Sequence, residues 1–255
     1  LEYASELGAD FIATGHYARK FQNAEGTHLL KGLDENKDQS YFLCEVSEAC
    51  LKRTLFPLGK LTKSEVREIA KKLELTTHDK KDSTGICFIG ERKFKDFLER
   101  YLPAQPGRIE SKEGEKVGTH AGLMFYTYGQ RQGLGIGGIQ KKAEAPWYVI
   151  GKDITKNILI VGQGNEQNDL FSNQLIASKT CWINRQEPVF PLNCFAKIRY
   201  RQTDQKCQVD FTQNDRLKVS FDEPQRAVTP GQYVVFYQND RCLGGAIIEQ
   251  YQESV

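Results

Sequence analysis

The sequence lacks the features of a membrane protein or an exported protein. It contains no run of about 18 apolar residues, the length that a helix needs to span a bilayer. Its first residues do not follow the charged, then apolar, then small-residue order of a signal peptide. We therefore expect a cytoplasmic protein with no membrane partner.

The sequence also lacks paired cysteines. Its seven cysteines are odd in number and scattered, and no two of them form a Cys-x-x-Cys pair. Structural zinc sites and redox-active helices use such pairs, and disulfide scaffolds use an even set. We therefore predict neither a disulfide scaffold nor a metal-ligating residue.

Net charge is small as well, at +2 for 255 residues. The field of the whole molecule is therefore weak, and a polyanionic partner has to be held by local basic groups. Such groups occur at residues 80–81, 92–95, 141–142 and 199–201. The residues that are present, 39% hydrophobic and 27% charged, are typical of a globular protein with about two compact units.

The first residues show an α/β pattern. Residues 2–7 indicate the end of a helix closed by Gly8, and residues 11–13 indicate an apolar strand that leads to Gly15 and His16. Ligands bind at the carboxyl ends of parallel strands, so this position favours contact with a nucleotide or a base. A plain turn that needs a glycine is the alternative.

Two helices are predicted after this strand. Residues 40–44 indicate a short one, and residues 64–73 indicate the clearest one, because Thr62 and Glu65 form the capping-box pattern at its start. Apolar residues recur on one face of the second helix, which predicts a stripe that packs in the core. The stripe consists of Val66, Ile69, Ala70 and Leu73.

Cys87 lies in a polar, glycine-bearing stretch, residues 80–90, that precedes a predicted helix at 91–101. Nearby lysines and a helix N-terminus both favour a thiolate over a thiol, which is the setting of a reactive cysteine. A small buried residue between Ile86 and Phe88 is an equally good interpretation.

From Gly114 onward the pattern changes to short apolar runs separated by turn residues. Residues 147–150 and 158–161 predict two strands joined by a turn at Asn157. Closer to the C-terminus, period-two alternation predicts four or more strands of a small antiparallel barrel or sandwich. On that pattern three cysteines are packing residues: Cys194, Cys207 and Cys242.

Gly133, Gly135 and Gly138 have the spacing of a dinucleotide-binding motif. Such a motif leaves a strand and opens an apolar-striped helix, whereas here a polar stretch and another strand follow. We therefore reject a nicotinamide or flavin site. A flexible basic loop that contacts phosphate and a simple glycine-rich connection both remain open.

Several segments together resemble the tRNA-specific 2-thiouridylase family, whose members replace the C2 oxygen of the wobble uridine by sulfur. The resemblance runs in one collinear order along nearly the whole chain. It implies three domains: the C-terminal part of a Rossmann-like, adenine-nucleotide hydrolase-like α/β domain (1–95), a small mixed central domain (96–165) and a C-terminal antiparallel β-barrel that binds tRNA (166–255). The matching segments are GADFIATGHYAR (8–19), NKDQSYFL (36–43), KDSTGICFIGERK (81–93), GQRQGLGIGG (129–138), FDEP (221–224) and TPGQ (229–232).

The resemblance also implies roles for individual residues. Cys87 is similar to the persulfide-bearing cysteine of the family, and Gly15 to a backbone contact with the adenine nucleotide. For the loop at 37–39 and for Arg199, charge alone would favour a solvated surface. The residues that resemble tRNA contacts are His16, Lys37, Asp38, Gln39, Arg199, Tyr200 and Gln232.

The activity implied is ATP-dependent 2-thiolation, in which adenylation of the base precedes sulfur transfer from the persulfide. Implied with it are Mg²⁺, a tRNA anticodon stem-loop with its target base turned out of the stack, and a sulfur-carrier protein supplied by a cysteine desulfurase. A transient disulfide between Cys87 and a partner cysteine would end the reaction.

Two elements of the family pattern belong before residue 1: a pyrophosphatase loop of the Ser-Gly-Gly-x-Asp-Ser type and the partner cysteine. The chain as given is therefore expected to be inactive alone. Two other functions remain open, a non-enzymatic tRNA-binding module and an ATP-dependent ligase of the same nucleotide fold. A ligase has no sulfur-transfer step, so this alternative gives Cys87 no chemical role.

Overall fold

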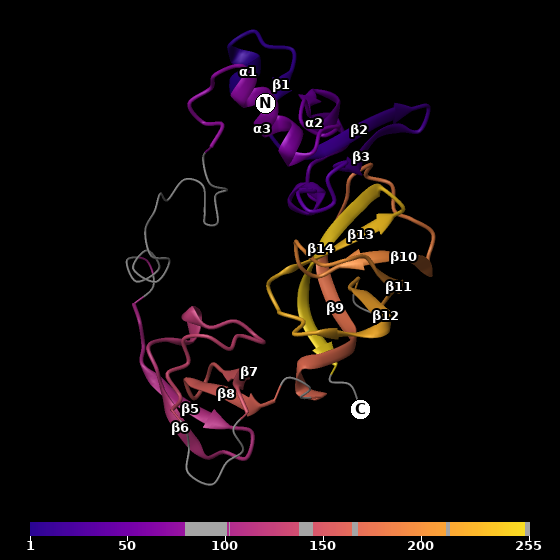
Figure 1. The fold of residues 1–255 in the computed structure, drawn as a ribbon. Helices are drawn as coiled ribbons and strands as arrows, with labels where there is room; N and C mark the ends of the chain where they lie inside the picture. Colours follow the sequence, from indigo (N-terminus) through magenta and orange to yellow (C-terminus); the bar gives the residue numbers. More distant parts are fainter. Residues whose placement is uncertain (80–100, 102, 138–144, 165–167, 213–214, 253–255) are drawn as a thin grey trace. The chain divides into compact units, whose positions relative to one another are not determined.

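The computed structural model describes residues 1–79, 101, 103–137, 145–164, 168–212 and 215–252. The chain divides into two compact units (Figure 1). The first unit comprises Leu1–Lys80, Asn173–Glu223 and Pro230–Gln252, and the second is built mainly from Lys81–Ser172 with Pro224–Thr229. No helix in the described ranges is long and apolar enough to cross a membrane. The predicted helix at 91–101 lies outside these ranges except for its last residue.

The first unit begins with the predicted α/β pattern. Strands β1 and β4 pair in parallel, with Ile12 opposite Thr54, and the Arg53 side chain donates hydrogen bonds to the carbonyls of Ala9 and Asp10. Gly8, at φ +76°, follows the first helix, as predicted. The elements are α1 (Glu2–Glu6), β1 (Ile12–Ala13), the 3₁₀ helix η1 (Ser40–Leu43), α2 (Glu48–Lys52), β4 (Thr54–Leu55) and α3 (Lys63–Lys72).

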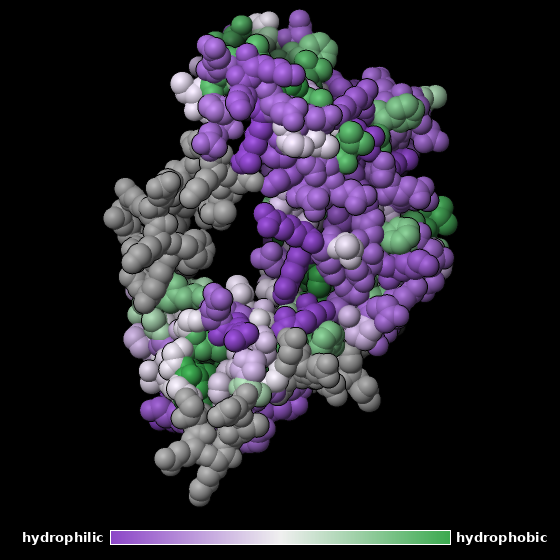
Figure 2. All heavy atoms as spheres, viewed as in Figure 1, coloured by the Kyte–Doolittle hydropathy of each residue, from purple (hydrophilic) through white to green (hydrophobic). Residues whose placement is uncertain are grey.

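Helix α3 begins as predicted, but the interpretation of its apolar stripe as core is wrong. The capping box is present: Glu65 donates its backbone N–H to Thr62 Oγ1 at 3.3 Å, and Thr62 returns one to Glu65 Oε2 at 2.6 Å. Ile69 is 44% exposed and Leu73 is 64% exposed. Figure 2 shows apolar side chains at the end of the unit that carries α1 and α3. Amphipathic periodicity identifies the face that a helix can bury, but it does not supply the element that covers this face.

A hairpin that was not predicted joins this α/β part to the barrel. Strands β2 and β3 pair with each other, and β3 continues the barrel sheet by placing Leu29 opposite Cys242 and Leu30 opposite Arg241 on β14 (Arg241–Gln252). Leu29 is fully buried in the core that results. The strands are β2 (Ala18–Asn23) and β3 (Gly26–Lys31).

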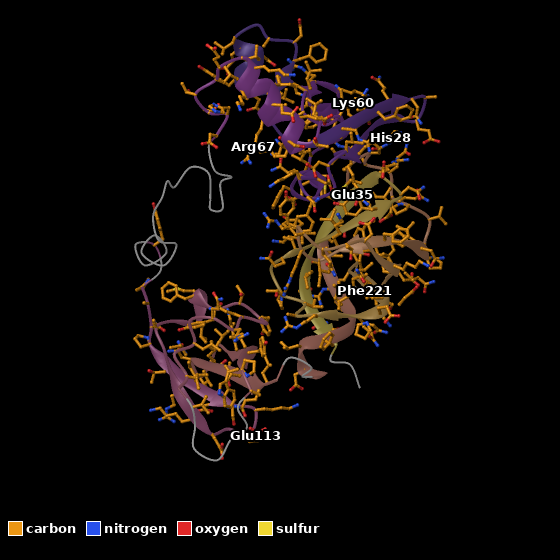
Figure 3. The ribbon with its side chains drawn as sticks, viewed as in Figure 1. His28, Glu35, Lys60, Arg67, Glu113 and Phe221 are labelled. Carbon is orange, nitrogen blue, oxygen red and sulfur yellow. The ribbon has the colours of Figure 1, made fainter. Side chains whose placement is uncertain are left out.

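The C-terminal sheet is a closed antiparallel barrel. In the described part of the chain its strands follow the order β13-β10-β11-β12-β9-β14, and β14 pairs back to β13. Val209 and Val219 face each other across β11 and β12 and are fully buried, and Phe221 follows on β12 (Figure 3). The strands are β9 (Phe171–Trp182), β10 (Leu192–Lys197), β11 (Gln205–Phe211), β12 (Leu217–Arg226), β13 (Tyr233–Gln238) and β14 (Arg241–Gln252).

The cysteines of the barrel are packing residues, as predicted. Cys194 and Cys207 are directly opposite each other on β10 and β11, with their sulfurs 3.7 Å apart, and both are buried. Cys242 on β14 is 1% exposed. The six cysteines that the structure describes carry free thiols, whereas Cys87 lies outside the described residues.

The second unit contains a four-stranded sheet in the order β6-β5-β8-β7. The predicted hairpin is confirmed: β7 and β8 pair antiparallel, and Asn157 takes φ +55° in the turn between them. Gly133 and Gly135 have positive φ, and Leu134 between them is buried in the core of this sheet, so this stretch packs as a connection up to Gly137. The strands are β5 (Gly107–Ser111), β6 (Lys116–His120), β7 (Trp147–Asp153) and β8 (Ile158–Gln163).

Buried His28 predicts a loss of stability at acidic pH. His28 lies on β3 (Figure 3), where Asn184 Nδ2 donates to its Nδ1 at 3.1 Å and its Nε2 lies 2.9 Å from Asn23 Oδ1. Burial, aided by the charge of Arg241, lowers the pKa of His28. The folded state therefore favours the neutral ring, and its contribution is fully present above the unfolded pKa of about 6.5 and is lost as pH falls from there toward the folded pKa.

Urea unfolding at pH 7.5 and pH 5 measures this effect against a His28→Gln variant. The parent protein is expected to lose more stability between the two pH values than the variant does, because glutamine does not titrate. Equal losses in the two proteins would contradict the role of His28.

Candidate functional site

Gly15 and His16 lie at the carboxyl edge of the parallel strand pair. Thr14 donates its backbone N–H to the Leu55 carbonyl at 3.0 Å, so the two strand ends stay together immediately before Gly15. Gly15 is exposed, and a side chain at this position would meet only Leu58 Cδ1, at 3.9 Å. An open backbone at this edge fits the approach of a nucleotide.

His16 is half-buried and its ring is held in place. Its Nδ1 lies 2.6 Å from Thr14 Oγ1. Burial lowers the pKa of His16, which favours the neutral ring. A neutral imidazole offers one donor and one acceptor, which suits contact with the edge of a base.

The loop at residues 34–39 is tied to the segment that carries His16. Tyr17 donates its backbone N–H to Gln39 Oε1 at 3.0 Å, and the backbone N–H of Gln39 donates to the Tyr17 carbonyl at 2.9 Å. Gly32 is required beside them, because a Cβ there would lie 2.6 Å from the Tyr17 carbonyl oxygen. The loop therefore has a fixed position next to His16.

The Asp38 side chain points into the protein. It is 5% exposed, and its Oδ1 accepts the backbone N–H groups of Gly32 and Ser40, each at 3.0 Å. Its carboxylate thus shapes the loop from inside, whereas Lys37 and Gln39 on either side are partly exposed.

Asp38 belongs to a group of two lysines and two aspartates that we call the lysine–aspartate cluster: Lys31, Asp38, Lys197 and Asp204. Lys197 Nζ lies 3.8 Å from Asp38 Oδ2 and 3.6 Å from Asp204 Oδ1, and Lys31 forms a short ion pair with Asp204. Both ammonium groups lie over the ring of Tyr237, at 4.7 and 5.3 Å from its centroid. The cluster joins β3, the loop, β10 and the residue before β11, and it contacts β13 through the Tyr237 ring.

Arg199, Tyr200 and Gln232 lie at one end of the barrel. Strands β10 and β13 are antiparallel, with Lys197 opposite Val235, so the residues after β10 lie beside the residues before β13. Arg199 and Gln232 are exposed. Period-two alternation of Ala196, Ile198 and Tyr200 predicts a strand that reaches Tyr200, which is wrong in one respect, because β10 ends at Lys197 and the chain then turns.

Tyr200 connects this end of the barrel to the loop. Its hydroxyl donates to the Lys37 carbonyl at 3.4 Å. Tyr41 lies beneath, where its hydroxyl donates to the Tyr233 carbonyl at 2.9 Å. Burial raises the pKa of Tyr41 to about 12, while the charge of Arg199 acts in the opposite direction. We call the surface formed by Lys37, Gln39, Arg199, Tyr200 and Gln232 the polar rim.

The structure thus gathers the predicted loop, the Arg199–Tyr200 turn and Gln232 at the polar rim, and it ties His16 to the rim through Tyr17 and Gln39. It does not place Cys87, which lies outside the described residues. The lysine–aspartate cluster was not predicted, and its one sequence signal was a lysine at the end of the apolar strand β10. Phe42 is exposed and its ring lies beside that of Tyr200, a feature that no sequence pattern indicated.

Three family models match successive segments of the chain. A tRNA methyl transferase HUP domain matches residues 1–91, a tRNA methyl transferase PRC-barrel domain matches 95–163, and an aminomethyltransferase β-barrel domain matches 172–248. The chain therefore contains an α/β domain of the HUP type, a PRC-barrel middle domain and a C-terminal β-barrel, in agreement with the predicted fold class.

The chain is similar to several proteins named tRNA-specific 2-thiouridylase MnmA. It is 60% identical over 248 residues to the protein from Marinomonas sp., which covers 97% of the chain and 64% of the relative. It is 59% identical over 249 residues to those from Pseudomonas putida and Hahella chejuensis, covering 98% of the chain and 66% and 68% of these relatives. The chain thus spans about two thirds of the length of these relatives.

Proposed function

The chain belongs to the tRNA-specific 2-thiouridylase family, and we propose on this premise that the intact protein replaces the C2 oxygen of the wobble uridine of tRNA by sulfur. The observation that carries the proposal is identity of 59–60% along nearly the whole chain to relatives of that name. We propose three domains: a catalytic domain at residues 1–95, a central domain at residues 96–165 and a tRNA-binding domain at residues 166–255.

The polar rim is the proposed tRNA contact. Arg199 and Lys37 would bind phosphates, which carry most of the affinity of a protein for RNA, and Tyr200, Gln39 and Gln232 would add hydrogen bonds. Asp38 would act from inside the protein by holding Lys37 and Gln39 in place. His16, beside the rim, would meet the tRNA near its reacting base. Turning that base out of the stack costs about a few kcal/mol, which contacts elsewhere on the anticodon stem-loop would offset.

ATP is a substrate of the proposed reaction, and the open backbone at Gly15 is a suitable contact for its adenine nucleotide. ATP would supply an adenylyl group that turns the uracil C2 oxygen into a leaving group. Mg²⁺ would accompany the phosphates. Among the described residues, no group of three or more His, Cys, Asp or Glu side chains is placed to hold a metal ion, so we assign no Mg²⁺ ligand.

Cys87 is the proposed carrier of sulfur, as a persulfide charged by a sulfur-carrier protein. The terminal sulfur would form a bond to C2 while the bond from C2 to the activated oxygen breaks. A second thiol would then attack Sγ of Cys87, which breaks the bond between Sγ and the transferred sulfur. The two cysteines are left joined in a disulfide, and the transferred sulfur stays on the uracil. In an alternative route with the same atom balance, the second thiol attacks the persulfide first. The disulfide then forms, and the released hydrosulfide attacks C2. A cellular reductant would reopen the disulfide in the cytoplasm.

The test is to express the intact coding sequence in a bacterial strain that lacks its own 2-thiouridylase and to quantify 2-thiouridine in digested tRNA. The modified nucleoside is expected to appear, and the empty vector is the control. If it stays absent while the purified protein still binds tRNA, the protein is a binding module and the proposed activity is wrong.

A further inference from the structure

An exposed phenylalanine, Phe42, packs against the half-buried Tyr200 of the polar rim. Phe42, in the 3₁₀ helix η1, is 57% exposed. Its ring centroid lies 4.4 Å from that of Tyr200, and the two planes are tilted by 39°. An exposed phenylalanine is unremarkable when it is isolated, but one that stacks on a second aromatic ring beside basic side chains resembles a binding surface.

The Phe42 ring is held by its surroundings. Its backbone N–H donates to the Gln39 carbonyl at 3.1 Å, which anchors the start of η1 to the loop. The buried ring of Tyr41 packs edge-on against Phe42, with centroids 5.6 Å apart and an interplanar angle of 86°. The pair is thus fixed before a ligand arrives, which reduces the entropy lost on binding.

The charges around the pair favour a polyanion. Arg199 is next to Tyr200 in the chain, and the carbonyl of Lys37 accepts a hydrogen bond from the Tyr200 hydroxyl. Of the acidic neighbours, Asp38 is buried in the lysine–aspartate cluster. Glu45 accepts a hydrogen bond from the Tyr233 hydroxyl, which raises the pKa of Tyr233 to about 12. Glu35, on the same loop, is exposed (Figure 3).

The geometry points to a platform on which an unpaired base of RNA stacks against the exposed face of Phe42, with Arg199 and Lys37 beside its phosphates. This inference rests on the proposed function and adds to it the binding of a single-stranded nucleotide of the anticodon loop. Single-stranded RNA is bound by this combination of aromatic faces and cations, and a base in a helix could not stack in this way. An apolar protein partner is a poorer occupant, because charged and polar groups surround the rings.

Phe42→Leu in the intact protein tests the platform, with a synthetic anticodon stem-loop RNA as the ligand in filter-binding titrations. Leucine keeps an apolar side chain but removes the flat face, so the dissociation constant is expected to rise by roughly tenfold. The slope of log affinity against log salt should not change, because no charge is removed. Phe42→Trp should retain affinity, and RNA should quench the fluorescence of the new indole.

Arg199→Ala is the electrostatic contrast and is expected to weaken binding and to reduce the salt slope by about 1. The matched control is Phe211→Leu. Phe211 is 41% exposed and packs on Phe190 with ring centroids 4.5 Å apart. It is the last residue of β11, which lies beside the start of β10, whereas the polar rim follows the end of β10. Its substitution should leave the affinity unchanged.

Equal affinity of Phe42→Leu and the parent protein, with RNA bound normally by both, would overturn the platform and leave the proposed function intact. An equal loss for Phe211→Leu would also overturn it, because the effect would then be general. A parent protein that binds no anticodon stem-loop and forms no 2-thiouridine would instead refute the proposed function.

Discussion

Replacement of Cys87 by alanine in the intact protein is expected to reduce 2-thiouridine in tRNA to background while tRNA binding stays normal. The reason is chemical: alanine cannot carry a persulfide, so no sulfur would reach the uracil, whereas the polar rim, the proposed RNA contact, is unchanged. Nucleoside analysis of tRNA from a complemented strain measures the first effect, and filter binding of purified protein measures the second.

Four of the six described thiols are poor substitutes for Cys87. Burial raises the pKa of Cys44 to about 12, and it also raises the pKa of Cys181 and Cys242. The pKa of Cys207 is raised by its hydrogen bond with Cys194 and by burial. Since the thiolate is the nucleophile, a raised pKa makes each of these thiols less reactive at neutral pH than an ordinary cysteine.

Cys50 provides the control for this experiment. It lies on α2, partly exposed, and its backbone N–H donates to Ser47 Oγ at 3.4 Å. Cys50→Ala removes a thiol without changing that bond, and 2-thiouridine should stay at the level of the parent protein. Normal 2-thiouridine in the Cys87→Ala strain would refute the role of Cys87.

Local features of the fold were predictable from sequence because short-range chemistry determines them. The capping box of α3 depends on two residues three positions apart, and the turn at Asn157 depends on a residue that tolerates positive φ. The buried cysteines of the barrel follow from strand alternation. In each case the pattern that supports the prediction lies within a few consecutive residues of the chain.

Long-range features were not predictable in this way. Lys31 and Asp204 are 173 positions apart, and no local pattern pairs them. The β2–β3 hairpin has a polar first strand, so only its pairing with β14 reveals that it extends the barrel. For the polar rim, resemblance supplied the residues, but it did not show that Asp38 faces inward while its neighbours face out.

The lysine–aspartate cluster carries the second large expected effect. Lys197 is 8% exposed and Asp38 is 5% exposed. Replacing Lys197 by methionine therefore removes the positive charge that is paired with the buried Asp38 carboxylate. Breaking such a pair costs about 3 kcal/mol in the free energy of unfolding. Urea unfolding monitored by circular dichroism measures this loss.

Two further variants separate the loss of charge balance from the loss of a lysine side chain. Lys206→Met removes an exposed lysine from the neighbouring strand β11 and should change stability by less than about 0.5 kcal/mol. Asp204→Asn, added to Lys197→Met, removes one of the carboxylates that Lys197 neutralises and should restore part of the lost stability. A double variant that is no more stable than Lys197→Met would argue against charge balance as the cause.

The same substitution connects the stability of the cluster to RNA binding. Because Asp38 fixes the loop that presents Lys37 and Gln39, loss of its Lys197 partner should loosen the polar rim and weaken the binding of the anticodon stem-loop. The salt slope should stay close to that of the parent protein, in contrast to Arg199→Ala, because Lys197 is buried and reaches no phosphate. A slope reduced as far as in Arg199→Ala would instead mean that Lys197 contacts RNA directly.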